Sequence, residues 1–328
     1  MMRILLARTD RIGDLILSTA AIATVRRSFP AAHVAIVTSS YNRVVVERND
    51  DVDELVAFER TADAVDWSRQ APRFDLAVAL APRIADLRIA GATRAACRVG
   101  YTYRRRWLVR LVAARCVDTL MLSEADPTLS EREPERRVRH EVDQLLDLVA
   151  LAGAFERVPR LRLDVRNEDR AALEGVPERP IVLHLGARWF STGSTAESTL
   201  RLLSQMADLG LPVLVTCPPE SAAYAASFEA PDRRWMLLEN LPFFVWAAAF
   251  ERAACVVTVD TAATHVASAV LRPTVVVFEH RYFALASQEW APYGVPNVLV
   301  RKPAGDDRSA LADFRERVVA GVAQLIHA

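Results

Sequence analysis

Hydrophobic residues fall into short apolar runs separated by amphipathic stretches, and this alternation predicts α-helices interleaved with parallel β-strands. In the first half of the chain, buried strands are predicted at residues 4–7, 33–37, 54–57, 75–80 and 97–100. In the second half they are predicted at residues 181–185, 212–216, 235–238, 255–259, 274–278 and 298–300. The pattern therefore indicates an α/β protein built from two similar halves.

Two polar segments interrupt this pattern and suggest where the domains end. Residues 123–140 are highly charged and contain prolines, which predicts a loop. Residues 177–180 begin and end with proline and are interpreted as the linker, so the predicted domains are 1–176 and 177–328. A chain of 328 residues is long enough for about two domains. Packing of the last helix, residues 308–326, against the first domain is left open.

The segment with the clearest chemistry starts at strand 255–259, which runs through a polar turn into a helix of small residues. Backbone N–H groups and the positive end of the helix dipole both attract anions at such a helix start. The candidate diphosphate-binding residues are Asp260, Thr261, Ala262, Ala263, Thr264 and His265. His265 can donate a proton or a hydrogen bond to a phosphate oxygen. The alternative is an ordinary strand-to-helix unit with a Thr261 N-cap and a satisfied histidine.

The start of the chain has a similar arrangement. Residues 3–7 predict a strand, residues 8–14 a tight polar turn and residues 15–29 a helix, so Asp14 lies above the carboxyl end of the first strand. Ligands bind at that edge of open α/β sheets. Gly13 permits a turn that brings the backbone close to a ligand. The alternative is that Asp14 only caps the helix.

These two motifs resemble those of glycosyltransferase family 9, whose heptosyltransferases transfer heptose from ADP-heptose to the lipopolysaccharide inner core. The likeness extends over nearly the whole chain, including residues 181–186, 214–220 and 290–294. It implies a GT-B architecture, with two Rossmann-like domains facing across a cleft. The acceptor would bind the N-terminal domain and the nucleotide-sugar donor the C-terminal domain. The resemblance also implies transfer that is independent of a metal and needs no cofactor.

Two more residues of the second half are candidates for donor binding. Glu220 follows a predicted strand, and its carboxylate can accept hydrogen bonds from both ribose hydroxyls. Its alternative role is that of a solvated residue at a helix start. Arg188 lies in a loop rich in hydrogen-bond donors, which is a candidate phosphate cradle, although such loops are also common without a ligand.

Three positions depart from the family pattern. Ala262 and Glu279 stand where the family usually has glycine, and a lysine expected after Gly186 is absent. Arg188 is the candidate replacement for that lysine. Glu279 and His280 are candidates for contact with the donor sugar, because a carboxylate beside a diphosphate is repelled unless it faces hydroxyls. These departures bear on the identity of the donor and acceptor more than on glycosyl transfer itself.

Basic residues of the first half are candidates for binding an anionic acceptor. Arg104, Arg106 and Arg110 belong to the densest basic patch there, and guanidinium groups bind carboxylates and phosphates with two hydrogen bonds. Arg11 and Gly13, next to the candidate base, are further acceptor-binding candidates. A solvated arginine surface is the alternative for the patch.

The predicted mechanism is a single displacement that inverts the anomeric carbon. Asp14 acts as general base and removes the proton of the acceptor hydroxyl as its oxygen attacks. The helix start at residues 261–264 stabilises the departing nucleoside diphosphate, with His265 and Arg188 as donors. Fixed N–H groups and a cation can take the place of a metal, because the developing charge lies on the leaving oxygen.

The predicted function is therefore transfer of a sugar, a heptose by resemblance, from a nucleoside-diphosphate donor to a hydroxyl of a saccharide or glycolipid. Three alternatives stay open. The first is a related transferase of a secondary-metabolite or capsule pathway. The others are a sugar-nucleotide epimerase and a nucleotide-sugar-binding protein without catalysis.

Composition narrows the function classes. The 41 basic and 41 acidic residues balance, so no net charge favours nucleic acid as a partner. The four cysteines are widely spaced, which indicates neither a disulfide framework nor a metal site. A G-x-G-x-x-G motif is missing from both first strand-to-helix turns, which argues against a nicotinamide enzyme. No apolar run reaches the roughly 18 residues that span a bilayer, so a cytoplasmic protein is expected, with a peripheral position at the inner membrane surface left open.

Overall fold

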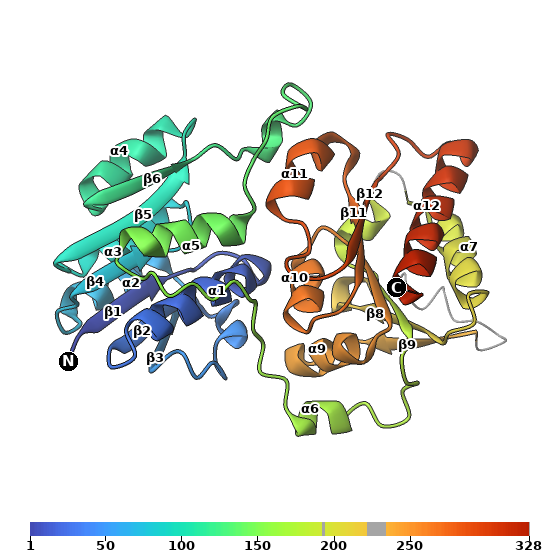
Figure 1. Cartoon of the computed structure of the whole chain (residues 1–328), viewed down its shortest axis with the longest axis horizontal. Helices are drawn as coiled ribbons and strands as arrows, with labels where there is room; N and C mark the ends of the chain where they lie inside the picture. The colour runs from blue at the N-terminus through green and yellow to red at the C-terminus, as the bar shows by residue number, and fades with distance from the viewer. Residues whose placement is uncertain (192–193, 222–233, 328) are drawn as a thin grey trace. The chain divides into compact units, whose positions relative to one another are not determined.

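The computed structural model describes residues 1–191, 194–221 and 234–327, and the chain divides into two compact units. Unit 1 comprises Met1–Asp126 and Val138–Leu163, and unit 2 comprises Pro127–Arg137 and Asp164–Ala328. Each unit has one six-stranded parallel sheet with helices on both faces (Figure 1).

Unit 1 has the strand order β3-β2-β1-β4-β5-β6. The strands are β1 Arg3–Ala7, β2 His33–Ser39, β3 Glu54–Phe58, β4 Leu76–Ala79, β5 Cys97–Tyr103 and β6 Thr119–Ser123. The helices are α1 Ile12–Ser28, α2 Thr61–Gln70, α3 Ile84–Ala92, α4 Trp107–Cys116 and α5 Glu141–Leu151, with a 3-10 turn η1 at Arg43–Val45. Helices α1 and α5 lie side by side on one face, while α3 packs between α2 and α4. This is the strand order of a Rossmann fold.

Unit 2 has the order β12-β11-β10-β7-β8-β9, which is the same topology. The strands are β7 Ile181–His184, β8 Val213–Cys217, β9 Trp235–Glu239, β10 Cys255–Val259, β11 Thr274–Phe278 and β12 Asn297–Arg301. The helices are α6 Asn167–Ala171, α7 Ala196–Ala207, α9 Phe243–Arg252, α10 Ala262–Ala269, α11 Phe283–Glu289 and α12 Arg308–Ile326. The 3-10 turns are η2 Pro127–Leu129, η3 Ala187–Phe190, η4 Pro219–Ser221 and η5 His280–Tyr282.

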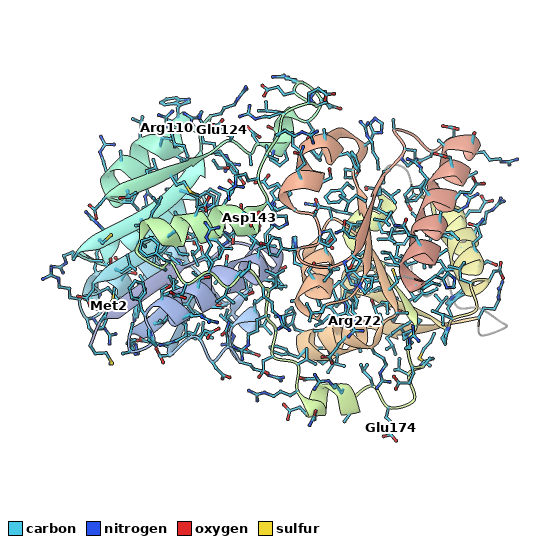
Figure 2. All side chains as sticks on the ribbon, in the orientation of Figure 1. Met2, Arg110, Glu124, Asp143, Glu174 and Arg272 are labelled. Atoms are coloured by element: carbon cyan, nitrogen blue, oxygen red, sulfur yellow. The ribbon has the colours of Figure 1, made fainter. Side chains whose placement is uncertain are left out.

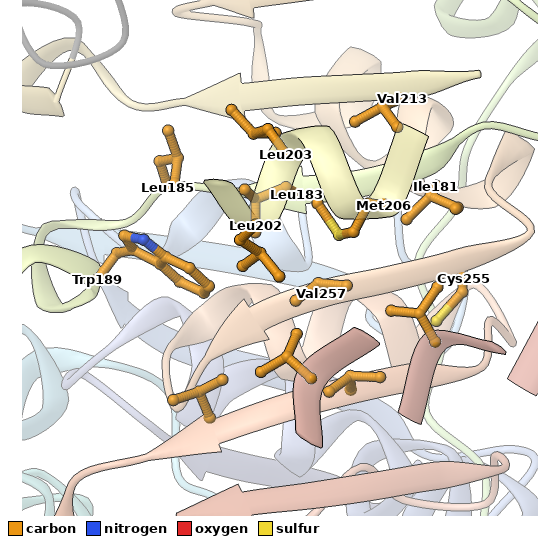
Figure 3. Close-up of a cluster of buried hydrophobic side chains, with 14 of the residues drawn as sticks. Ile181, Leu183, Leu185, Trp189, Leu202, Leu203, Met206, Val213, Cys255 and Val257 are labelled. Atoms are coloured by element: carbon orange, nitrogen blue, oxygen red, sulfur yellow. The ribbon is translucent and has the colours of Figure 1, made fainter. Parts of the chain in front are cut away.

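The central strands are apolar on both faces because helices cover both sides of each sheet. In unit 2, Leu202, Leu203 and Met206 of α7 face the strand residues Leu183 and Val257 (Figure 3). Burial of such side chains contributes about 1.5–3 kcal/mol each to folding. This core fixes the loops at the carboxyl ends of the strands.

The last helix, α12, completes the same core. Phe314, Val318 and Val322 are buried against it, and α12 contacts α7 as well as β10, β11 and β12. Gly321 permits this approach, because a Cβ at that position would lie 3.0 Å from Cγ1 of Val298. The apolar face of α12 is thus used within the core of unit 2.

Other details differ from the sequence-based expectations. Strand β6 at the edge of the unit 1 sheet was not predicted, because its apolar run of three residues directly precedes the charged segment 123–140. The division between the units falls at residues 163 and 164 and not at 176 and 177, and residues 127–137 group with unit 2. In the described part of the chain, no helix is long and apolar enough to cross a membrane.

Candidate active site

Each sheet reverses its strand order once, and the candidate motifs lie at these two switch points. In unit 1 the reversal lies between β1 and β4, and in unit 2 between β7 and β10. Loops leaving neighbouring strands in opposite directions open a crevice at the carboxyl edge, where ligands bind. The loop after β1 carries Asp14, and the loops after β7 and β10 carry Arg188 and Asp260.

A buried arginine organises the unit 1 site. Arg8 directly follows β1, and its side chain is only 1% exposed. The guanidinium lies 2.9 Å from Asp10, 3.3 Å from Asp14 and 3.3 Å from Glu141. It also donates to the carbonyl oxygen of Leu80, at the end of β4. Arg8 therefore connects Asp14, which follows β1, with Leu80, which follows β4, across the switch point. The sequence analysis did not assign this role to Arg8.

The environment of Asp14 shifts its protonation equilibrium. Burial is the main cause that raises the pKa of Asp14 from 3.8 to about 7, and the negative charge of Asp10 adds to the shift. Arg8 acts in the opposite direction. A carboxyl group with a pKa near the working pH can both accept and release a proton, which suits a general base.

A second buried carboxyl group shares this environment. Asp86, in the first turn of α3, accepts hydrogen bonds from the backbone N–H and the hydroxyl of Thr9, at 2.7 and 3.0 Å. Burial raises the pKa of Asp86 to about 7. Four carboxyl groups thus surround one guanidinium, so the cluster cannot ionise fully at neutral pH without charge repulsion.

The residues around Asp14 differ in one respect from the predicted turn. Helix α1 begins at Ile12, two residues after Asp10, so Gly13 and Asp14 both lie in its first turn. Gly13 is buried and does not have a positive φ angle, so the turn does not need its conformational freedom. Arg11 is the exposed N-cap residue of α1.

In unit 2, two motifs that are distant in the sequence come together. The Arg188 guanidinium donates to the backbone oxygen of Asp260 at 2.9 Å and lies 3.7 Å from its carboxylate. The Arg188 side chain remains half exposed, at 50%. Helix α10 begins at the next turn, with Thr261 as N-cap and His265 buried. A cation and a helix N-terminus therefore share one edge of the sheet, which is the chemistry of an anion site.

The only lysine of the chain, Lys302, lies beneath the Arg188 loop. Its ammonium group is buried and donates to the backbone oxygens of Arg188 and Trp189, at 2.7 and 3.2 Å. It also lies 2.7 Å from the Ser191 hydroxyl and 3.2 Å from the Glu279 carboxylate. Burial lowers the pKa of Lys302, while Glu279 opposes that shift. The lysine expected after Gly186 is absent, but Lys302, which directly follows β12, donates hydrogen bonds to the backbone of the same loop.

This network also fixes the two candidates for donor-sugar contact. Glu279 follows β11, and its carboxylate accepts hydrogen bonds from Lys302 and Ser191. The His280 ring nitrogen Nδ1 lies 3.1 Å from the backbone oxygen of Lys302. Both side chains thus contribute to the support of the loop.

A small pocket lies at the carboxyl ends of β7, β8 and β9. Its volume is about 140 Å³, and its walls are His184, Thr216, Cys217, Pro218, Pro219, Leu238, Asn240, Leu241 and Trp246. Burial lowers the pKa of His184 to about 3, so the ring is neutral, and its Nδ1 lies 3.0 Å from the Thr216 hydroxyl. The His184 and Trp246 rings lie 4.9 Å apart. The Trp246 indole N–H is buried and has no hydrogen-bond partner among the described residues.

Glu220 lies in η4, next to Pro219 of this pocket, but its side chain is outside the described part of the structure. In unit 1, Arg104 pairs with Glu124, and the Arg106 guanidinium lies 4.6 Å from the Tyr103 ring. Arg110 donates to the backbone oxygen of Arg104 at 3.3 Å. The three candidate acceptor arginines are thus exposed neighbours around the start of α4.

Among the residues that the structure describes, no group of three or more His, Cys, Asp or Glu side chains could hold a metal ion. The carboxyl groups around Arg8 are held by its guanidinium and by hydrogen bonds from Thr9.

Several solved glycosyltransferases have a fold similar to that of this chain. A family 9 glycosyltransferase from Veillonella parvula aligns over 99% of this chain and 97% of its own, with a TM-score of 0.77 and 16% identity. E. coli ADP-heptose lps heptosyltransferase II aligns over 100% and 99%, with a TM-score of 0.72 and 18% identity. E. coli heptosyltransferase WaaC with ADP aligns over 98% and 100%, with a TM-score of 0.67 and 16% identity. The prediction of a GT-B fold with two Rossmann-like domains is confirmed.

No curated protein matches the chain by sequence. The family model described as glycosyltransferase family 9 (heptosyltransferase) matches residues 132–309, which is more than half of the 328 residues. The predicted resemblance is confirmed, and the chain belongs to glycosyltransferase family 9.

Proposed function

We propose that this glycosyltransferase moves a heptose from an ADP-heptose-like donor to a hydroxyl group of a saccharide or glycolipid, with inversion at the anomeric carbon. The observation that carries the proposal is Asp14, a carboxyl group held by Arg8 at the switch point of unit 1, with a pKa of about 7. A base of this pKa removes a proton from an alcohol only as the new bond forms, which is what single displacement requires.

Unit 2 has the features expected of a donor site. The Arg188 guanidinium and the N-terminus of α10, residues 261–264, would hold the two phosphates. As the glycosidic bond breaks, the electron pair moves to the diphosphate oxygen, and these groups stabilise its charge. His265 would add a hydrogen bond at the same place. This arrangement of a cation and N–H groups supports transfer without a metal.

The pocket beside Pro219 suits a planar nucleotide base. Its walls are largely apolar, and Trp246 offers an indole N–H that lacks a partner among the described residues. Glu220, the next residue in the sequence, is proposed to bind the ribose hydroxyls, because a carboxylate can accept hydrogen bonds from both of them. The adenine base is proposed because an E. coli heptosyltransferase of the same fold was solved with ADP.

The acceptor is proposed to be anionic and to bind unit 1. Arg104, Arg106 and Arg110 are exposed, and Arg11 lies at the start of α1 beside the base. Guanidinium groups bind phosphate and carboxylate groups, which the sugars of a lipopolysaccharide core carry. The reaction is proposed to take place in the cytoplasm.

The decisive experiment measures product formation with ADP-, GDP-, UDP- and TDP-sugars and a set of acceptors, for the protein and for Asp14→Asn. We expect one donor to bind both proteins equally, and turnover to fall by about a hundredfold or more in Asp14→Asn. The control is Asp63→Asn, which removes an exposed carboxylate from the first turn of another helix, α2. Unchanged turnover in Asp14→Asn would remove Asp14 from the mechanism, and conversion of the donor alone would indicate an epimerase.

A further inference from the structure

Helix α4 turns large apolar side chains towards solvent. Trp107, Leu108 and Leu111 are 63%, 58% and 52% exposed. A helix on the surface of an α/β domain normally buries such residues against the sheet. In α4 only Ala113 is fully buried, and Val109 is half-buried against the same core. The small side chains anchor this helix, and the large ones are left on its outer face.

Basic residues surround this apolar face. Residues 104–117 contain five arginines and no acidic residue, in a chain whose net charge is zero. The arginines are Arg104, Arg105, Arg106, Arg110 and Arg115, and all of them are exposed. Arg110 is marked on the outer side of unit 1 in Figure 2, together with Glu124, the partner of Arg104. Exposed tryptophan and leucine within an arginine cluster therefore form one continuous surface, which we call the α4 surface.

We propose that the α4 surface binds an anionic lipid bilayer, with Trp107, Leu108 and Leu111 inserted among the headgroups. Helices that lie in a membrane interface combine tryptophan and leucine on one side with basic residues around them. The indole ring favours the interfacial depth, and long arginine side chains reach the headgroups from there. The attraction between arginines and anionic lipids adds to the apolar contribution.

Charge argues against the two other kinds of occupant. A symmetric contact between two copies would bring the same five arginines against each other, which like charges disfavour. Nucleic acid would account for the arginines, but it would leave Leu108 and Leu111 exposed to a polar backbone. A lipid surface accounts for both kinds of side chain at once.

This inference does not depend on the proposed reaction, because lipid binding can be measured without any sugar donor or acceptor. The probe is large unilamellar vesicles of phosphatidylcholine, with or without about one-third phosphatidylglycerol. Co-sedimentation should show binding to the anionic vesicles only, and raised salt should weaken it because exposed charges are screened.

Two pairs of variants test the two contributions separately. Trp107→Ser should weaken partitioning by about tenfold or more, whereas Phe155→Ser, which removes another exposed aromatic side chain of unit 1, should not. Arg115→Glu should weaken it by about tenfold or more, since two charges change. Its control is Arg73→Glu, at another exposed arginine of unit 1. None of these four residues belongs to the proposed catalytic or binding groups.

Several outcomes would overturn the proposal. Absence of sedimentation with anionic vesicles is one, and equal losses for Trp107→Ser and Phe155→Ser is another. A dimer in solution that Trp107→Ser dissociates would assign the α4 surface to a second copy. Binding to an RNA that survives Trp107→Ser but not Arg115→Glu, without vesicle binding, would assign the arginines to nucleic acid.

Discussion

Replacement of Asp14 by asparagine should stabilise the protein above neutral pH, and this gain should disappear in acid. Burial raises the pKa of Asp14 from 3.8 to about 7, so the folded protein holds this proton more tightly than the unfolded chain does. A carboxyl group of this kind contributes stability below its unfolded pKa and loses that contribution as the pH rises through its folded pKa. The free energy of unfolding should therefore fall between about pH 4 and pH 7. In Asp14→Asn this fall should be smaller by the contribution of Asp14, while Asp86, whose pKa is also raised to about 7, keeps its own contribution.

The size of the effect follows from the shift. A shift of about three pKa units corresponds to about 4 kcal/mol in the free energy of unfolding. This value is an upper limit, because the Asp14 side chain is 20% exposed and water screens its charge. The variant also loses the ion pair with Arg8, although Arg8 keeps Asp10 and Glu141 as partners. We expect the pH-dependent difference between the two proteins to be about 2–3 kcal/mol, or roughly 5–10 °C in apparent Tm.

The assay is thermal unfolding of the protein and of Asp14→Asn from about pH 4 to pH 8. Asp63→Asn serves as control, because this exposed carboxylate in the first turn of α2 should leave the pH dependence unchanged. Parallel curves for the protein and Asp14→Asn would mean that the carboxyl group ionises normally. In that case the argument for a base poised near neutral pH would fail.

Two further predictions concern substrate binding. Arg188→Ala should weaken binding of a nucleoside diphosphate and leave binding of the nucleoside unchanged. Lys302→Met should also weaken binding of the diphosphate and not of the nucleoside, and it should lower the Tm. The double variant should bind the diphosphate no more weakly than Arg188→Ala does, because Lys302 acts through the Arg188 loop. Additive losses of binding free energy in calorimetry would contradict this coupling. The double variant Arg104→Ala with Arg106→Ala should raise the acceptor KM and reduce the salt dependence of that KM, while the donor KM stays constant. Unchanged kinetics in this variant would mean that these arginines form a solvated surface.

Much of the fold was predictable because it depends on local patterns. Apolar runs predicted the buried strands of both sheets, and the helix at 141–151 and the helix at 308–326 begin and end as expected. Strand β6, residues 119–123, was not predicted, because its short apolar run, residues 120–122, directly precedes the charged segment 123–140 that was interpreted as a loop. The start of α1 was placed three residues late, because Gly13 and Asp14 in its first turn are residue types that favour turns.

The sequence by itself determined the residues at the carboxyl ends of the strands, including Asp14, Arg188 and the segment 260–265. A strand-to-helix turn is a local feature, and its chemistry can be read from neighbouring residues. The sequence did not reveal that Arg8 would gather three carboxylates, or that Asp86 would join them from the start of α3. Those contacts depend on which strands are neighbours.

Only the tertiary structure decided how residues distant in the sequence act together. Lys302 contacts the Arg188 loop, 114 positions earlier in the sequence, because the parallel strands β7 and β12 both end at the same edge of one sheet. The exposed face of α4 was equally hidden, since Trp107 and Leu111 have the sequence spacing of buried residues. Periodicity shows which side chains share a face of a helix, but solvent exposure is set by the surface against which that helix packs.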